Sequence, residues 1–93
     1  MFESDLLKDE TIIVTGGGTG IGKSMSQRFG ELGANLVIAG RRGDVLEETA
    51  IELRATGAKV LPVPCDVRNT TEVQEMVDRT VAELGGVNVL VNN

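Results

Sequence analysis

A glycine-rich stretch near the N-terminus, TGGGTGIG at residues 15–22, constrains the fold of this chain more than any other feature. It places five glycines within eight residues. Glycine loses more backbone freedom on folding than any other residue, so such a concentration suits a site where the chain must turn tightly or pack closely. The stretch lies between a β-branched apolar run at residues 11–15 and an amphipathic segment that begins at Ile21. It therefore predicts a turn from a buried strand into the N-terminus of a helix.

The rest of the chain repeats this alternation of strand and helix. Short apolar runs predict further strands over residues 35–39, 59–64 and 88–93. Three apolar stripes at helical spacing separate the strands, formed by Ile21, Met25, Phe29 and Leu32, then by Leu46, Ala50 and Leu53, and then by Val73, Met76, Val77, Val81 and Leu84. Two acceptor–glutamate pairs, Asp44 with Glu47 and Asn69 with Glu72, are spaced as helix N-caps.

This β-α-β-α-β-α-β order predicts a Rossmann-type α/β fold, a doubly wound parallel sheet truncated to four strands and three helices. Right-handed crossovers favour the strand order 3-2-1-4, with the first two helices on one face and the third on the other. Pro62 has no N–H to donate, which suits an edge position for the third strand. The fourth strand forms the opposite edge, and its apolar Val89, Leu90 and Val91 predict self-association. We also expect that a longer protein has been cut after this strand.

Composition excludes several functional classes. With 93 residues the chain fits one small domain, and its net charge of −5 without a long basic run argues against nucleic acid or an anionic membrane as partner. One cysteine and no histidine exclude a disulfide framework and argue against a zinc or haem site. No run of 18 apolar residues predicts a membrane span, and residues 1–10 lack the order of a signal peptide. We therefore expect a cytoplasmic protein whose Cys65 is reduced, buried and apolar in character.

A glycine turn that leads into a helix is suited to binding an anion, because unpaired N–H groups and the helix dipole point at the ligand. Two common phosphate motifs compete for this loop. The dinucleotide motif GxGxxG is not satisfied, since the sixth position counted from Gly16 is Ile21. Residues 17–24, GGTGIGKS, formally match the nucleoside triphosphate motif GxxxxGK[ST]. Against this second motif, no later strand ends convincingly in a magnesium-binding Asp, and Lys23 can equally be a solvated residue of the first helical turn.

A third spacing, TGxxxGxG with Gly16, Gly20 and Gly22, resembles the nucleotide loop of the short-chain dehydrogenase/reductase family. Three further stretches resemble this family in order and spacing, and they are GRR at 40–42, PCDV at 64–67 and NN at 92–93. The resemblance extends from about Leu7 to the last residue. It implies that residues 1–93 are the N-terminal part of a single dinucleotide-binding domain. Within the family, the loop, IAGRR and PCDV are most similar to the 2,4-dienoyl-CoA reductase branch.

The resemblance implies a cofactor site made of Gly16, Gly18, Thr19, Gly20, Ile21, Gly22, Arg41, Arg42, Asp66, Val67 and Asn92. The second predicted strand ends in arginines rather than in an acidic residue that would bind a ribose 2′-hydroxyl. Because the guanidinium fork suits phosphate, we predict NADP(H) rather than NAD(H), with Arg41 the preferred partner of the 2′-phosphate. Alternatively, both arginines are solvated and pair with Asp44 or Glu47. Thr19 departs from the pattern of many NADP-using members of the family, which carry a basic residue at this position.

The resemblance also implies roles beyond the loop. Asp66 would accept a hydrogen bond from the adenine amino group, with the Val67 N–H reaching the ring, and Asn92 would contact the adenosine ribose. Alternatively, Asp66 satisfies nearby backbone donors.

The family's catalytic residues are a Ser, a Tyr-x-x-x-Lys pair and usually an Asn, and all of them lie beyond the segment that Asn92 and Asn93 begin. This sequence contains no Tyr, so we assign no catalytic residue and expect the chain alone to be inactive. The complete protein would transfer hydride to or from a carbonyl, alcohol or enoyl substrate, as a homo-oligomer. The alternative is a stand-alone module that binds nucleotide or completes its sheet with another chain.

Overall fold

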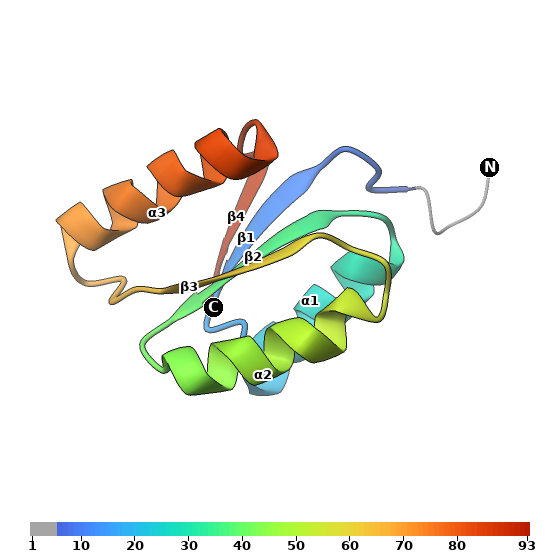
Figure 1. Ribbon diagram of the computed structural model, residues 1–93, viewed down its shortest axis with the longest axis horizontal. Helices are drawn as coiled ribbons and strands as arrows, with labels where there is room; N and C mark the ends of the chain where they lie inside the picture. The colour runs from blue at the N-terminus through green and yellow to red at the C-terminus, as the bar shows by residue number, and fades with distance from the viewer. Residues whose placement is uncertain (1–5) are drawn as a thin grey trace.

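Four parallel strands form one sheet in the order β3-β2-β1-β4, which confirms the predicted topology. The computed structural model describes residues 6–93. The elements in chain order are β1 (Thr11–Thr15), α1 (Gly20–Glu31), β2 (Asn35–Gly40), α2 (Gly43–Arg54), β3 (Val60–Pro64), α3 (Thr70–Leu84) and β4 (Val89–Asn92). Helices α1 and α2 cover one face of the sheet and α3 covers the other, as predicted (Figure 1). No helix among residues 6–93 has the length and apolarity to cross a membrane.

Successive residues of the central strands serve opposite faces of the sheet. Ile12 and Val14 of β1 pack toward α1 and α2, whereas Ile13 packs toward α3. Each face therefore has its own apolar cluster, which explains why β1 is buried along its whole length. The predicted stripe of α2 is confirmed, since Leu46, Ala50 and Leu53 are all buried in the first cluster.

Helix α1 bears out its predicted apolar stripe only in part, since Met25 and Phe29 pack against the first cluster. Ile21 is 72% exposed, and the buried residues of this helix are Gly22, Ser26 and Gly30. These small residues let the helix backbone approach its neighbours closely, since a Cβ at Gly30 would lie 2.7 Å from Thr56 Oγ1. The predicted core position of Ile21 is therefore wrong, because small side chains determine which face of α1 is buried.

The first turns of α2 and α3 differ from each other. Asn69 caps α3 as predicted, with its Oδ1 accepting the Glu72 N–H at 3.1 Å. The Glu72 carboxylate accepts the Asp66 N–H at 3.2 Å. The predicted Asp44 cap is wrong, because α2 begins at Gly43 and Asp44 lies within its first turn.

Helix α3 buries Met76 and Thr80, whereas Val81 is 49% exposed. The predicted core position of Val81 is therefore wrong. The Thr80 hydroxyl donates to the Met76 carbonyl at 2.8 Å, so its polar group is satisfied while it faces the sheet.

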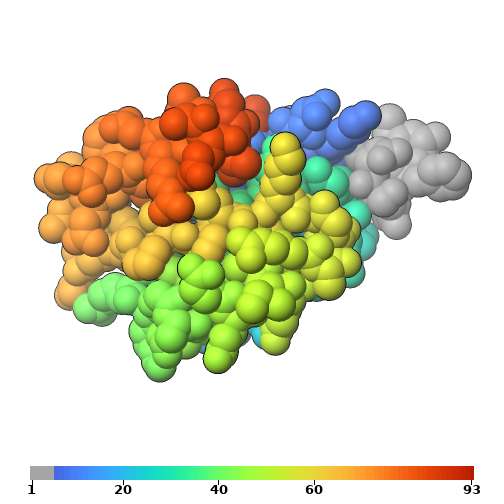
Figure 2. All heavy atoms as spheres, viewed as in Figure 1, coloured from blue at the N-terminus to red at the C-terminus, as the bar shows by residue number. Residues whose placement is uncertain are grey.

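Both sheet edges lie where the sequence places them. Pro62 lies on β3, and in the described part of the chain this strand has β2 as its single neighbour. Figure 2 shows β3 in yellow between α3 and α2. At the other edge, β1 is the one strand within residues 6–93 that pairs with β4, and Val89 and Leu90 are 44% and 54% exposed. The predicted bare apolar edge is therefore confirmed.

Candidate functional site at the carboxyl ends of the strands

The glycine loop joins β1 to α1 through a turn that requires glycine at specific positions. Gly16 and Gly20 have φ values of +68° and +55°, which residues with a Cβ rarely adopt. Gly16 also donates its N–H to the Ala39 carbonyl at 2.7 Å, which ties the loop to the end of β2. Glycine is needed at position 22 for a steric reason, since a Cβ there would lie 2.0 Å from the Gly16 carbonyl oxygen. The loop and the first turn of α1 therefore form one closely packed unit.

Helix α1 begins without a side-chain cap. Thr19 occupies the N-cap position but makes no capping hydrogen bond, and the first turn contains no acidic residue. Helix α3, by contrast, has both the Asn69 cap and Glu72 in its first turn. The amide groups at the start of α1 thus combine the positive end of the helix dipole with a missing side-chain acceptor, which is the electrostatic requirement for binding an anion.

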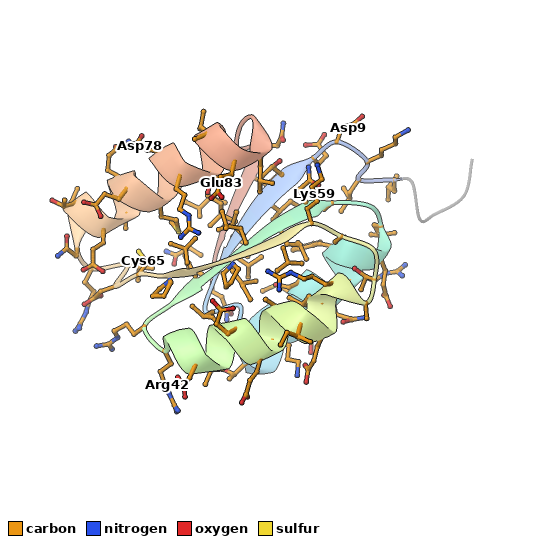
Figure 3. All side chains as sticks on the ribbon, in the orientation of Figure 1. Asp9, Arg42, Lys59, Cys65, Asp78 and Glu83 are labelled. Atoms are coloured by element: carbon orange, nitrogen blue, oxygen red, sulfur yellow. The ribbon has the colours of Figure 1, made fainter. Side chains whose placement is uncertain are left out.

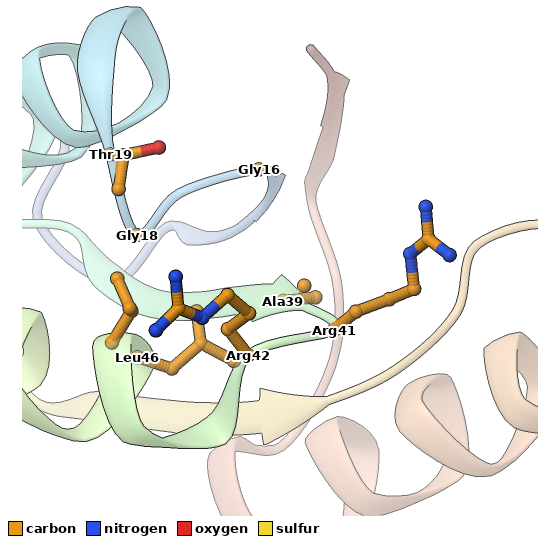
Figure 4. Close-up of a pocket in the computed structure, with 9 residues that line it drawn as sticks. Gly16, Gly18, Thr19, Ala39, Arg41, Arg42 and Leu46 are labelled. Atoms are coloured by element: carbon orange, nitrogen blue, oxygen red, sulfur yellow. The ribbon is translucent and has the colours of Figure 1, made fainter.

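A cavity of about 280 Å³ connects this loop with the end of β2 (Figure 4). Its lining consists of Gly16, Gly18, Thr19, Ala39, Gly40, Arg41, Arg42, Val45 and Leu46. Figure 3 shows Arg42 and Cys65 at this end of the sheet, with Asp9 and Lys59 at the opposite end. The structure therefore brings three of the six predicted loop residues, Gly16, Gly18 and Thr19, together with both predicted arginines, whereas the other three, at the start of α1, do not line this cavity.

The two arginines differ in their surroundings. Arg42 Nη2 lies 3.1 Å from Asp44 Oδ2, and this hydrogen bond, with the Val45 N–H, lowers the pKa of the Asp44 carboxyl. The alternative interpretation, an arginine paired with Asp44, thus applies to Arg42. Among residues 6–93 no carboxylate forms an ion pair with Arg41, which is exposed. Figure 4 shows the Arg41 side chain extending away from that of Arg42, so the two guanidinium groups point in different directions.

Asp66 is held by its own loop. Its Oδ1 accepts the Arg68 N–H at 3.0 Å and Arg68 Nε at 3.2 Å, while Oδ2 accepts Arg68 Nη2 at 3.2 Å. These bonds from Arg68, the guanidinium first, lower the pKa of the Asp66 carboxyl, and Arg41 adds a weaker attraction. The predicted alternative, an Asp that satisfies local donors, is therefore present in the structure. A carboxylate offers about four acceptor positions, so Oδ2 retains room for one more donor.

The other predicted adenosine residues lie outside the glycine-loop cavity. Val67 and Asn92 line a separate cavity of about 120 Å³, together with Thr15, Val73, Met76 and Leu90. Neither they nor Asp66 belong to the lining of the larger cavity. The predicted site is thus spread over two cavities at this end of the sheet, with Asp66 and the three residues at the start of α1 outside both linings.

Thr15 links the ends of β1 and β4, a role that the sequence prediction did not assign. Its hydroxyl has two acceptors within reach for its one proton, the Val91 carbonyl at 3.3 Å and Asn92 Oδ1 at 3.1 Å, and it accepts the Asn93 N–H at 3.0 Å. Asn92 therefore ties neighbouring strands together through Thr15. The sequence did contain a signal for this role of Thr15. A hydroxyl residue at the end of an otherwise apolar buried strand needs a hydrogen-bond partner nearby.

Two further residues that the sequence analysis considered, Lys23 and Cys65, lie outside the lining of the larger cavity. Lys23 forms an ion pair with Glu52 of α2 and is not among the residues that line the cavity. This pair supports the solvated, structural interpretation of Lys23 over the nucleoside triphosphate motif. Cys65 is a buried free thiol, and its burial, followed by the charges of Glu72 and other carboxylates, raises its pKa.

A doubly wound sheet with a glycine turn at the carboxyl end of its first strand is the arrangement of nucleotide-binding α/β proteins. Comparison with known proteins narrows this class. The sequence profile of the family described as short chain dehydrogenase matches residues 10–93, and the chain belongs to this family.

Relatives in several organisms share this part of the sequence. A peroxisomal 2,4-dienoyl-CoA reductase of Arabidopsis thaliana is 35% identical over 91 residues, which cover 98% of this chain and 30% of the reductase. A hydroxysteroid 11-beta-dehydrogenase 1-like protein of Danio rerio is 38% identical over 93 residues, which cover 99% of this chain and 32% of that protein. The chain thus spans about a third of the length of these relatives.

Solved structures agree with the fold along the chain. A citronellol catabolism dehydrogenase of Pseudomonas aeruginosa superposes with a TM-score of 0.93 at 41% identity, covering 100% of this chain and 39% of the other. L-sorbose reductase of Gluconobacter frateurii, solved with NADPH and L-sorbose, superposes with a TM-score of 0.90 at 33% identity, covering 96% of this chain and 35% of the other. The family binds nicotinamide dinucleotides, so the cavity beside the glycine loop is the candidate cofactor site.

Proposed function

We propose that residues 6–93 bind the adenosine and pyrophosphate parts of NADP(H) in a short-chain oxidoreductase. The observation that carries this proposal is the shared cavity, which joins the uncapped N-terminus of α1 to Arg41 and Arg42. A pyrophosphate needs backbone N–H donors and positive potential, and the start of α1 offers both. A 2′-phosphate needs a cation at the end of β2, and two arginines are present there.

The preference for NADP(H) over NAD(H) depends on Arg41 in this proposal. Arg42 already has Asp44 as partner, whereas Arg41 has its guanidinium available to a phosphate. Asp66, Val67 and Asn92 would hold the adenosine beyond the arginines. The one remaining acceptor position on Asp66 Oδ2 is where the adenine amino group would donate.

Calorimetric titration of the purified chain with NADPH and with NADH tests the proposal. We expect NADPH to bind more tightly, and Arg41→Asp to weaken NADPH binding by at least about tenfold, because hydrogen bonds to charged groups contribute about 1.5–3 kcal/mol. Arg79→Asp on α3 makes the same change in net charge outside the cavity and is the matched control. Unchanged NADPH affinity in Arg41→Asp would show that another residue selects the cofactor.

Hydride transfer to or from a carbonyl, alcohol or enoyl substrate belongs to the complete enzyme in this proposal. Named relatives include reductases and dehydrogenases of three times this length. The sequence has no Tyr that could donate a proton, so residues 1–93 alone should not oxidise NADPH with any such substrate. Homo-oligomerisation of the complete protein and a cytoplasmic location stay predictions, the latter because relatives include proteins named peroxisomal.

A further inference from the structure

Thr49 is a buried polar residue on α2 that faces the glycine loop. Its side chain lies on the apolar face of the helix beside Leu46, Ala50 and Leu53, and it is 3% exposed. Its hydroxyl donates to the Gly18 carbonyl at 2.7 Å, across 31 positions of sequence. A buried hydroxyl must find a partner, and this one finds it on the loop rather than on its own helix.

Two other buried hydroxyls in the same protein behave differently. Ser26 donates to the Gly22 carbonyl of α1, and Thr80 donates to the Met76 carbonyl of α3, each at 2.8 Å and four residues earlier. This bond within the helix is the ordinary choice for a helical hydroxyl that faces away from water. The hydrogen bond of Thr49 is therefore a tertiary contact between α2 and the glycine loop.

The contact fixes the orientation of one peptide group at the start of α1. The peptide bond between Gly18 and Thr19 is trans, so its C=O and N–H point in opposite directions. Because the Gly18 carbonyl is directed at Thr49, the Thr19 N–H is directed away from α2, among the first amides of α1. Gly18 lies close to α2 here, since a Cβ added to it would lie 3.2 Å from Val45 Cγ1 and 3.3 Å from Leu46 Cδ2. Figure 4 shows Gly18 facing Leu46 across this contact.

We propose that Thr49 is a positioning residue for the anion site, which holds the Gly18–Thr19 peptide so that its N–H can serve a pyrophosphate. This inference rests on the proposed function of dinucleotide binding. It adds a residue from α2 that does not line the cavity and would not itself contact the cofactor. Without the hydroxyl, the Gly18 carbonyl loses its partner and the peptide is free to turn, so the amide is no longer pre-oriented for phosphate.

Three variants of the whole chain test this proposal. Thr49→Val removes the hydroxyl at nearly constant volume, Thr49→Ser keeps it, and Thr80→Val removes a buried hydroxyl that bonds within α3. We expect Thr49→Val to weaken NADPH binding about five- to tenfold, the equivalent of one buried hydrogen bond. Thr49→Ser should stay within about twofold of the wild type, and Thr80→Val should bind as the wild type does even where it lowers the melting temperature.

A second ligand separates positioning of the loop from general damage to the domain. Adenosine 2′-monophosphate lacks the pyrophosphate, so Thr49→Val should change its affinity much less than that of NADPH. Equal losses for both ligands would overturn the proposal, as would NADPH affinity of Thr49→Val equal to that of the wild type. If Thr49→Val does not fold, Thr49→Ala is submitted to the same measurements.

Hydrogen exchange without ligand decides the structural part independently of cofactor binding. Amides of residues 16–20 should exchange faster in Thr49→Val than in the wild type or Thr80→Val, because the loop has lost its contact with α2. Unchanged exchange at these amides would overturn the inference. If the wild type binds no NADPH while the exchange result is as expected, the proposed function fails and the role of Thr49 in ordering the loop stands.

Discussion

Replacing Gly22 by Ala adds only one methyl group, but we expect it to destabilise the fold strongly. A Cβ at this position would lie 2.0 Å from the Gly16 carbonyl oxygen and 2.7 Å from the Gly16 carbonyl carbon, whereas real Cβ atoms almost never approach closer than 3.0 Å. Both clashing atoms belong to the backbone, so no side-chain rotation relieves the contact. Gly16 is itself held by its hydrogen bond to the Ala39 carbonyl. The start of α1 must therefore move by about 1 Å relative to the loop, as the shortfall from 3.0 Å requires.

The size of the effect follows from two opposing contributions. Overpacking costs about 1–3 kcal/mol and occasionally more, and a clash between backbone atoms belongs at the upper end. Alanine is favoured over glycine inside a helix by about 1 kcal/mol, which offsets part of the cost. A net loss of about 2 kcal/mol corresponds to a melting temperature about 8–16 °C lower for a domain of this size. Displacement of the α1 N-terminus should also weaken NADPH binding.

Thermal unfolding followed by circular dichroism measures this effect, with Gly86→Ala as the matched control. A Cβ at Gly86 meets no atom within 4 Å, so its addition should be tolerated. If Gly22→Ala melts at the same temperature as Gly86→Ala, the close packing of loop and helix is not what requires glycine at position 22.

Three more predictions concern charge, thiol reactivity and the sheet edge. Because Arg68 lowers the pKa of Asp66 below its ordinary value of 3.8, their contact stabilises the fold above that pH and is lost as the pH falls through the lowered pKa. Urea unfolding of Asp66→Asn at a series of acidic pH values should show a flatter loss of stability there, and a slope equal to that of the wild type would contradict this. Burial raises the pKa of Cys65, so a disulfide reagent at mildly alkaline pH should modify it much more slowly in the native chain than in urea, and equal rates would be inconsistent with the buried thiol. Leu90→Lys should reduce concentration-dependent association in sedimentation velocity, since it places a charge on the bare β4 edge. Leu6→Lys, at another exposed leucine, is the control and should leave association unchanged. Equal effects of the two substitutions would show that the chains associate through another surface.

The sequence alone was sufficient for the architecture. Apolar runs and helical stripes alternate along the chain, and the handedness of crossovers leaves few arrangements for such an alternation. The strand order, the distribution of helices over the two faces and the edge positions of Pro62 and Leu90 followed correctly. The glycine spacing and the arginines at the end of β2 predict a phosphate-binding site beside the first turn of α1, and this site stays a prediction.

Only the tertiary structure decided which side chains meet. Ile21 and Val81 follow the helical period but are exposed. The residues buried next to them are Gly22, which has no side chain, and Thr80, whose hydroxyl donates within its own helix. The spacing of apolar residues shows which side chains along one helix are apolar. This spacing does not show how closely another helix or strand can approach that helix.

The hydrogen-bond partners of buried polar side chains are also decided by the tertiary structure. Thr49 reaches Gly18 and Thr15 reaches Asn92 across distances in sequence that no local pattern spans. A hydroxyl in an apolar stripe signals in the sequence that a buried partner must exist, because burying it unpaired is costly. Which carbonyl accepts it depends on how α2 packs against the loop, and that packing is set by the whole sheet.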